Sequence, residues 1–344
     1  MSTDELLAVS VLWGFVFIYA VMATMDFGAG FWSMVYINRE KTNATNISNR
    51  YLSPTWKVTN VFIVGIVVAL ISFFPGATYT LGTVLLIPGS LILILLSIRS
   101  GFLVFSHIAE DYRKGLTYIS GITGLLIPGL LIAVLPITHG GYIEIINGVE
   151  QLQLDILFTS PQTYAFMAFA ISSTLFLSSL LLADYSNVAD EKEAYAIYRR
   201  DAVLLGPIVL FTTFFIMLTM EIEAPWIYQN MMEYFPLLLT SILIFLLGYI
   251  ALFLPSGVKR RVTGRPRAAV VAVVTQYLLA SYAYGRAHLP YLVYPIVTVE
   301  SGFTHPATFR AVFISYIVGF VILFPGFIYF WRLFMNDRRY IRQE

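Results

Sequence analysis

The sequence lacks cysteine altogether and contains few charged residues. Without cysteine, the chain can form neither disulfides nor Cys-ligated zinc or iron–sulfur centres. Charged residues make up 12% of its 344 residues, about half the share found in average soluble domains. A net charge of +1 without a suitable basic tract gives no indication of a nucleic-acid partner.

Long apolar segments dominate what is present. Hydrophobic residues make up 58% of the chain, with 27 Phe and 22 Tyr, and the mean hydropathy is +0.77. A helix needs about 20 apolar residues to cross a bilayer. Nine segments qualify: residues 6–37, 54–74, 78–107, 116–137, 162–183, 202–221, 236–255, 266–286 and 310–333.

These segments predict an all-α integral membrane protein with nine transmembrane helices. We expect two four-helix bundles plus one peripheral helix. The first segment has an acidic start and no cleavage site, so it is expected to remain as a helix. The loops are too short to bury a core of their own, which makes residues 1–344 a single polytopic membrane domain.

The positive charges predict the orientation of the chain. When helix ends are counted with their nearest loop, 19 of the 21 Lys and Arg residues fall on one side of the predicted membrane. Only Arg286 and Arg310 fall on the other side. Because positive loops stay in the cytoplasm, we expect the N-terminus outside and the C-terminus in the cytoplasm.

Two charged residues lie inside apolar segments. Residues 24–31 read TMDFGAGF and place Asp26 in the first segment, and Arg99 lies within the third. A charge at that depth is costly unless it is paired or hydrated. One interpretation is a polar cluster with Lys57 and Asn60 that serves as a proton or ion path. The other is an Asp26–Arg99 ion pair that locks two helices together.

The neighbouring residues have simpler explanations. Lys57 can extend to the membrane interface beside Trp56 as a belt residue, without joining any cluster. Gly28 and Gly30 lack side chains and let another helix approach closely.

The histidines do not indicate a haem or metal site. A membrane haem needs a histidine within a helix, opposite a second ligand. None of the four has that placement, so we expect interfacial polar side chains at His107, His139, His288 and His305. We expect no metal site in this chain.

The stretch 288–306 is rich in Pro, Tyr and apolar residues and carries one carboxylate, Glu300. It contains too many prolines for a helix. We expect it either to fold back into the membrane under a protein cover or to form a lid against a partner subunit.

In order and spacing, these motifs resemble subunit II of cytochrome bd-type quinol oxidases. In that family the first helix ends in a pattern close to D-G-F-D-x-G-x-G, the second begins H-W-D-G-N-x-V-W, and the third ends with Arg followed by Gly-Phe. The matching residues are Asp26, Gly28 and Gly30; Trp56, Asn60 and Val61; and Arg99, Gly101 and Phe102. The resemblance covers the whole chain and groups Gly101 with the packing glycines.

This chain departs from the family pattern at several positions. The first Asp of the first motif is absent, Lys57 replaces a carboxylate in the second motif, and Thr55 replaces its His. The family associates these carboxylates with a proton route toward the haems. Asp26 is therefore the one carboxylate left at a motif position.

The resemblance implies a complex that oxidises quinol and reduces oxygen to water in a bacterial or archaeal cell membrane. It places haem b, haem d and the quinol site in a partner, subunit I, and no cofactor in this chain. This chain would supply scaffold and access for protons or oxygen. A small single-helix subunit and a bound lipid or quinone are further expected partners.

Two other functions remain open from the residues. A secondary transporter would show broken helices and internal repeats, and no repeat is visible. A purely structural membrane subunit would contain no path at all.

Overall fold

The computed structural model describes residues 1–38, 42–105, 112–255 and 263–336. Within this part of the chain, eight helical spans are long and apolar enough to cross a membrane. They belong to α1 (Thr3–Val35), α2 (Ala44–Phe73), α4 (Leu86–Phe105), α5 (Arg113–Ile132) with α6 (Val134–Thr138), α8 (Pro161–Ala189), α9 (Lys192–Glu223), α12 (Pro266–His288) and α14 (Pro306–Asn336). A ninth span results if α10 (Pro225–Glu233) and α11 (Phe235–Ile250), which meet at 79°, are counted as one.

The predicted boundaries are wrong in three places. The segment predicted at 78–107 is two helices, because α3 (Pro75–Val84) ends before α4 begins. Helices α2 and α9 begin at Ala44 and Lys192, well before the predicted residues 54 and 202. Hydropathy detects only the apolar part of a helix, whereas the helix itself continues through polar residues outside the hydrocarbon.

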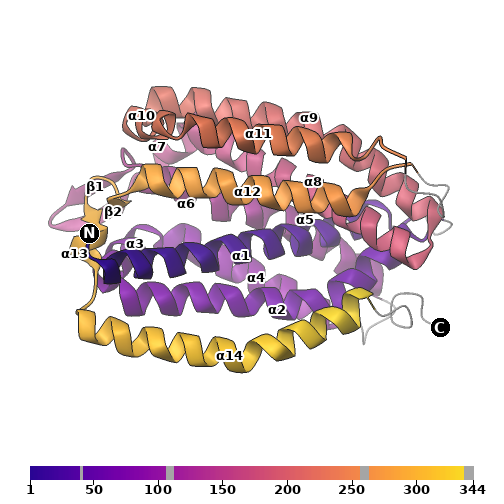
Figure 1. The fold of residues 1–344 in the computed structure, drawn as a ribbon. Coiled ribbons are helices and arrows are strands. Elements are labelled where there is room, and N and C mark those ends of the chain that lie inside the picture. Colours follow the sequence, from indigo (N-terminus) through magenta and orange to yellow (C-terminus); the bar gives the residue numbers. More distant parts are fainter. Residues whose placement is uncertain (39–41, 106–111, 256–262, 337–344) are drawn as a thin grey trace.

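Two short hairpins, which the sequence analysis did not predict, lie at one end of the helices (Figure 1). Strands β1 (Ile143–Ile146) and β2 (Val149–Leu152) are joined by Asn147 and Gly148, both at positive φ, as in a two-residue hairpin turn. The helix α7 (Leu154–Thr159) follows them.

The second hairpin occupies the stretch 288–306, as β3 (Tyr291–Val293), β4 (Val297–Thr298) and the short helix α13 (Val299–Gly302). Its buried residues Val293, Val297 and Val299 pack against Phe73 and Phe74 at the end of α2. Thr304 also donates its backbone N–H to the Phe73 carbonyl oxygen. The stretch therefore forms a cap on the helix ends of its own chain.

Helix α1 contacts α2, α5 and α8, and α8 continues the packing to α9 and α12. Helix α8 is the most buried span and carries many small polar residues, which allow close approach of helices in membranes. Helix α14 lies along the outside (Figure 1), touches α1 and α2, and exposes its apolar side chains along the span. This exposed surface suits contact with lipid.

Candidate functional site

The close approach of helices around Asp26 depends on two glycines. A Cβ atom at Gly28 would lie 2.8 Å from the Thr174 carbonyl oxygen and would overlap the Ser178 side chain. A Cβ atom at Gly30 would lie 2.7 Å from Nη1 of Arg99. Gly28 thus lets α8 approach α1, and Gly30 leaves room for the guanidinium.

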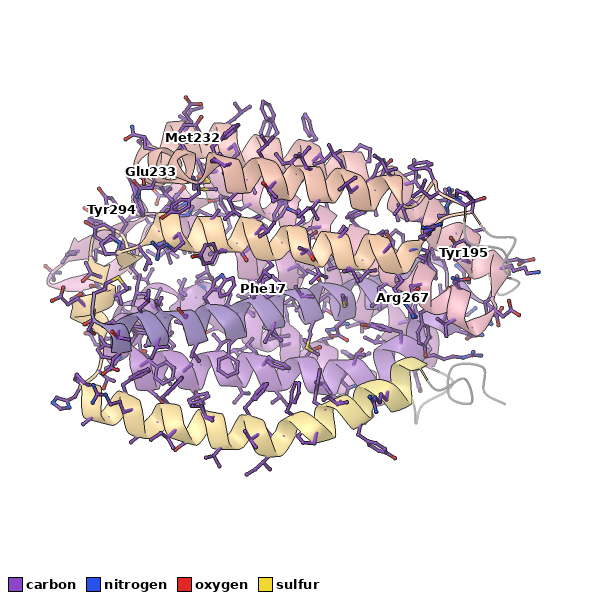
Figure 2. All side chains as sticks on the ribbon, in the orientation of Figure 1. Phe17, Tyr195, Met232, Glu233, Arg267 and Tyr294 are labelled. Atoms are coloured by element: carbon purple, nitrogen blue, oxygen red, sulfur yellow. The ribbon has the colours of Figure 1, made fainter. Side chains whose placement is uncertain are left out.

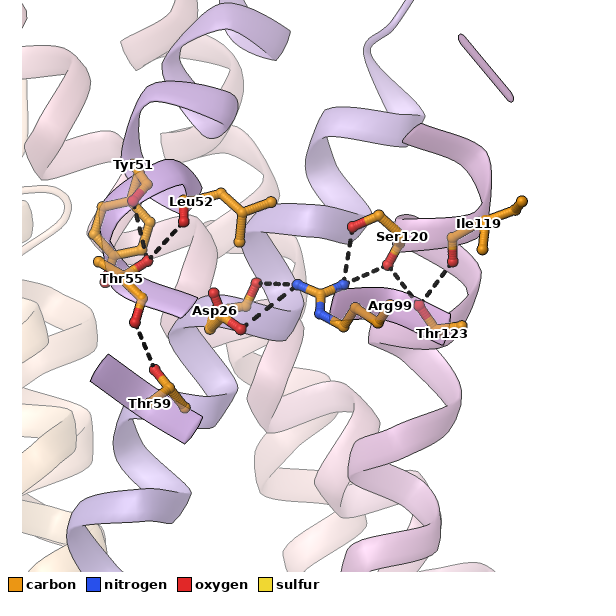
Figure 3. Close-up of polar contacts among 9 residues, drawn as sticks. All are labelled: Asp26, Tyr51, Leu52, Thr55, Thr59, Arg99, Ile119, Ser120 and Thr123. Carbon is orange, nitrogen blue, oxygen red and sulfur yellow. Dashed lines mark hydrogen bonds and ion pairs between the residues drawn. The ribbon is translucent and has the colours of Figure 1, made fainter. Parts of the chain in front are cut away.

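Arg99 reaches from α4 into the junction of α1 and α5 (Figure 3). Its Nη1 donates to the carbonyl oxygen of Ser120 at 2.5 Å and to Oγ of Ser120 at 3.0 Å. Its Nη2 donates to the backbone carbonyl oxygen of Asp26 at 3.0 Å and lies 3.7 Å from Oδ2 of the same residue. The guanidinium carbon also lies 5.2 Å from the centroid of the Phe27 ring.

The Asp26–Arg99 pair is almost completely buried, with 3% of Asp26 and 2% of Arg99 exposed. It joins three helices whose contacting residues are far apart in sequence. Since an isolated charge inside a membrane is very unfavourable, each of these two residues requires the other.

The second oxygen of the Asp26 carboxylate has a different environment. Thr55 lies beside Asp26, but its hydroxyl donates to the backbone oxygens of Tyr51 and Leu52. Among the described residues, Oδ1 of Asp26 therefore has no donor, and the buried Tyr19 hydroxyl likewise has no partner. Buried polar atoms of this kind are usually satisfied by water.

The residues predicted at the start of the second helix lie apart from this pair. Lys57 is exposed, with its Nζ 5.8 Å from the Trp56 ring centroid, and Asn60 is half-buried. In the described part of the chain, no hydrogen bond or ion pair joins Lys57 or Asn60 to Asp26 or Arg99. The residues of α2 that lie on the Asp26 side of this site are instead Tyr51, Thr55 and Thr59 (Figure 3).

Sequence reasoning missed this polar stripe of α2. Tyr51, Thr55 and Thr59 recur every four residues, which puts them on one helix face, and all three are buried. That spacing was the available signal.

Three further predicted positions are simple to place. A Cβ atom at Gly101 would meet nothing within 4 Å. Glu300 is exposed on α13, and His107 lies outside the described residues.

The prediction of interfacial histidines is wrong for His139. This residue is 2% exposed, and its Nδ1 accepts from the Gln162 amide at 3.0 Å. Its Nε2 lies 2.6 Å from the Tyr284 hydroxyl, and the His288 ring centroid lies 5.9 Å from its own. Residues of α8 and α12 thus enclose His139, which caps the end of α6.

The environment keeps His139 neutral. Burial, and then the nearby His288, lower the pKa of His139 well below its ordinary value. Both of its ring nitrogens are engaged with protein groups, so the residue does not fit the role of an axial haem ligand. His305 is exposed, as predicted for an interfacial residue.

A carboxylate that sequence reasoning did not single out anchors the same end of the protein. Glu223, at the end of α9, accepts from Oγ of Ser160 at 2.5 Å, the Tyr142 hydroxyl at 3.0 Å and the Gln162 backbone N–H at 3.1 Å. Burial raises the pKa of Tyr142 to about 12, so this phenol keeps its proton. The negative charge stands at the N-terminus of α8, where the helix dipole favours it.

A second buried carboxylate lies toward the opposite end of the helices. Asp201 of α9 is 5% exposed and accepts a short hydrogen bond from the Tyr36 hydroxyl. Its other oxygen lies 2.9 Å from Nη2 of the more exposed Arg200. Asp201 thus ties the end of α1 to α9.

The spans and the buried Asp26–Arg99 pair define a polytopic membrane protein, and comparison with known proteins gives its family. The sequence model described as cytochrome bd terminal oxidase subunit II matches residues 5–334. The chain belongs to this family.

Two relatives agree over nearly the whole length. The chain is 64% identical over 344 residues to the "putative cytochrome bd menaquinol oxidase subunit II" of Bacillus subtilis (strain 168), which covers all of this chain and 99% of that protein. A chain of the bd oxidase from Geobacillus thermodenitrificans superposes with a TM-score of 0.82 at 34% identity, covering 98% of this chain and 100% of that chain.

Family membership confirms the resemblance that the motifs indicated. The protein is therefore a multi-pass subunit of an oxidoreductase complex in a bacterial cell membrane. It works together with a subunit I partner.

Proposed function

We propose that this chain is the subunit without redox centres in a complex that oxidises quinol and reduces oxygen to water. In this proposal haem b, haem d and the quinol site belong to subunit I. The engagement of both nitrogens of His139 supports this assignment. The name of the Bacillus subtilis relative favours menaquinol as the substrate of the complex.

Visible absorption spectra test the location of the haems. Each of His107, His139, His288 and His305 is replaced by Gln in the complex. We expect every haem band to remain in each variant that assembles. Loss of one band from an assembled variant would show that this chain supplies a ligand.

We propose that the N-terminus lies outside the cell and the last helix ends in the cytoplasm. The distribution of Lys and Arg supports this orientation, and α1 begins at the end opposite to that where α14 ends (Figure 1). The proposed arrangement is two four-helix bundles with α14 peripheral.

Single cysteines test the orientation, since the native chain has none. An impermeant thiol reagent applied to intact cells should label position 150 and leave position 265 unlabelled. The reverse pattern would overturn the orientation.

The Asp26–Arg99 pair is proposed as the main element of the scaffold. The observation that carries this is the set of contacts of Arg99, whose guanidinium joins α4 to backbone oxygens of both α1 and α5. Backbone carbonyl oxygens are fixed by their helices and do not titrate, whereas a second carboxylate could change rotamer or become protonated. This arrangement favours a fixed structural role for Arg99.

A proton route is the second candidate, and a separate observation favours it. Oδ1 of Asp26 and the Tyr19 hydroxyl are buried and have no partner in the described part of the chain. Water at these atoms would give the carboxylate a proton to accept, in a span that otherwise excludes water. This would be an access point for protons used in oxygen reduction.

The Asp26→Asn variant separates the two candidates. Once the haem spectrum shows that the complex has assembled, oxygen consumption is measured from about pH 6 to 9. A proton route predicts slow turnover, with a loss that grows as protons become scarce at high pH. A structural pair predicts turnover per assembled complex equal to wild type. Asp184→Asn, which removes a carboxylate paired with the exposed Arg267 at 3.0 Å, is the matched control.

The remaining predicted positions receive peripheral roles. We propose that Lys57 and Trp56 anchor α2 at the membrane interface, with Lys57 exposed and Trp56 half-buried beside it. Glu300 is proposed to contact the partner subunit from the second hairpin. The exposed face of α14 is available to lipid or to a small single-helix subunit.

A further inference from the structure

A cavity of about 470 Å³ lies beside the bend between α10 and α11. Pro225 starts α10 and Pro236 stands in the first turn of α11, so neither proline can continue the preceding helix. Nδ2 of Asn230 donates to the Ala287 carbonyl oxygen at 3.0 Å and fastens the bend to the end of α12. The cavity is therefore built into the fold.

The cavity holds one of the two arginines on this side of the membrane. The other, Arg310, is neutralised by Asp4 at 2.9 Å. Arg286 has no carboxylate within 4.0 Å in the described part of the chain, and its main polar neighbour is the Tyr234 hydroxyl. The Arg286 side chain is exposed, so its guanidinium is available to bind an anionic group of a ligand.

A carboxylate lines the same cavity without pairing with that arginine. Glu233 is exposed at the end of α10 (Figure 2), and it too has no ion-pair partner among the described residues. The cavity thus offers a cation and an anion that do not neutralise each other. A ligand that carries both charges complements it.

The position of the cavity decides the class of ligand. The spans of α9 and α12 end at Glu223 and His288, so the cavity lies at the depth of the lipid headgroups. Its remaining wall includes the apolar residues Leu6 and Leu289, which suit the glycerol and upper acyl chain of a lipid.

We propose that this cavity binds the headgroup of phosphatidylethanolamine. The guanidinium of Arg286, with the Tyr234 hydroxyl, binds the phosphodiester, because arginine matches phosphate oxygens in geometry and charge. Glu233 accepts hydrogen bonds from the ammonium group and so disfavours phosphatidylglycerol. Placement in the outer leaflet rests on the proposed orientation, whereas the choice of lipid does not.

The assembled complex, depleted of lipid in detergent, tests this by native mass spectrometry. Phosphatidylethanolamine or phosphatidylglycerol is added, and bound lipid is counted. The wild type should bind one phosphatidylethanolamine in preference to phosphatidylglycerol. Arg286→Gln should weaken binding of both lipids by about tenfold, as for one lost charge-assisted hydrogen bond, and Arg286→Lys should recover part of it. Glu233→Gln should remove only the preference.

Two variants on the same side serve as controls. Arg310→Gln removes an arginine and Glu221→Gln an exposed carboxylate, both outside the cavity, and neither should change lipid binding. The haem spectrum reports assembly for every variant. Unchanged binding in assembled Arg286→Gln refutes the site, and equal binding of the two lipids by wild type refutes the role of Glu233. Full competition by millimolar inorganic phosphate would identify a phosphate site instead of a lipid site.

Discussion

Replacing Arg99 by Leu removes the cation from the buried pair and leaves its other contacts incomplete. The Asp26 carboxylate would then remain 3% exposed without a positive neighbour. The carbonyl oxygen of Ser120 would lose a donor at 2.5 Å, but it belongs to a helix and keeps its backbone environment. The main cost therefore falls on Asp26.

The structure allows the size of this effect to be estimated. At the observed 3.7 Å, two unit charges attract by about 4–5 kcal/mol at an effective dielectric constant of about 20. Removing one partner of a buried pair generally costs about 3–5 kcal/mol, because the other charge is left unpaired. Arg99→Leu and Asp26→Asn should each lower stability by that amount. The double variant should lose about 2–3 kcal/mol less than the sum of the two.

The assay is the thermal loss of the haem absorption bands in the detergent-purified complex, with the yield of assembled complex as a second readout. Both should fall in the single variants, and in the double variant they should fall by less than the sum of the two single losses. The control pair Asp184 and Arg267, whose Arg side chain is 64% exposed, should change stability by less than about 1 kcal/mol. Additive losses in the Asp26–Arg99 double variant would refute the pairing.

Three other predictions follow from single contacts. Gly28→Ala should reduce assembly, since its Cβ would lie 2.8 Å from a carbonyl oxygen. Gly101→Ala meets open space and should leave stability unchanged or raise it by up to about 1 kcal/mol. Thermal melting of the two complexes compares these variants. Glu223→Gln should lower the melting temperature by an amount equivalent to about 1–2 kcal/mol, because charge-assisted hydrogen bonds are lost. Glu221→Gln, at an exposed position, should leave it unchanged. Equal melting temperatures of the two variants would contradict the anchoring role of Glu223. The pKa of His139 is lowered by burial, so the unfolded state binds the extra proton and stability should fall as pH drops below about 6.5. His139→Gln should flatten this pH dependence of melting, and an unchanged slope would assign it to other groups.

The membrane spans were predictable because insertion into a bilayer depends mainly on local composition. Each apolar segment contributes its own transfer free energy, whatever its neighbours are. The break between α3 and α4 was not visible in this way, since both helices are apolar and Leu85 between them is apolar too. The early start of α2 was missed for the opposite reason. In residues 44–53, apolar residues such as Ile47 and Leu52 alternate with polar ones, so the stretch has no net hydropathy signal.

The candidate site was predictable only in part. Asp26 and Arg99 stand out because charges are rare in apolar segments, and the family motifs place the same two residues. The role of Ser120 could not be read from the chain, since serine is common in membrane helices and this one lies 21 residues from Arg99. His139 was misjudged because its position beside a loop suggested water, while helices from elsewhere in the chain bury it.

Hydropathy, rare charges and motifs in the chain were enough to predict that this protein crosses the membrane repeatedly, that Asp26 and Arg99 lie inside it, and to which family it belongs. Hydropathy and a rare charge act locally, so they can be read without knowing which helices meet. The packing of the helices was needed to show which groups satisfy those charges, how Glu223 and His139 are enclosed, and that Arg286 and Glu233 share a cavity without pairing. These features depend on contacts between residues far apart in the chain, and such contacts exist only once the helices have packed.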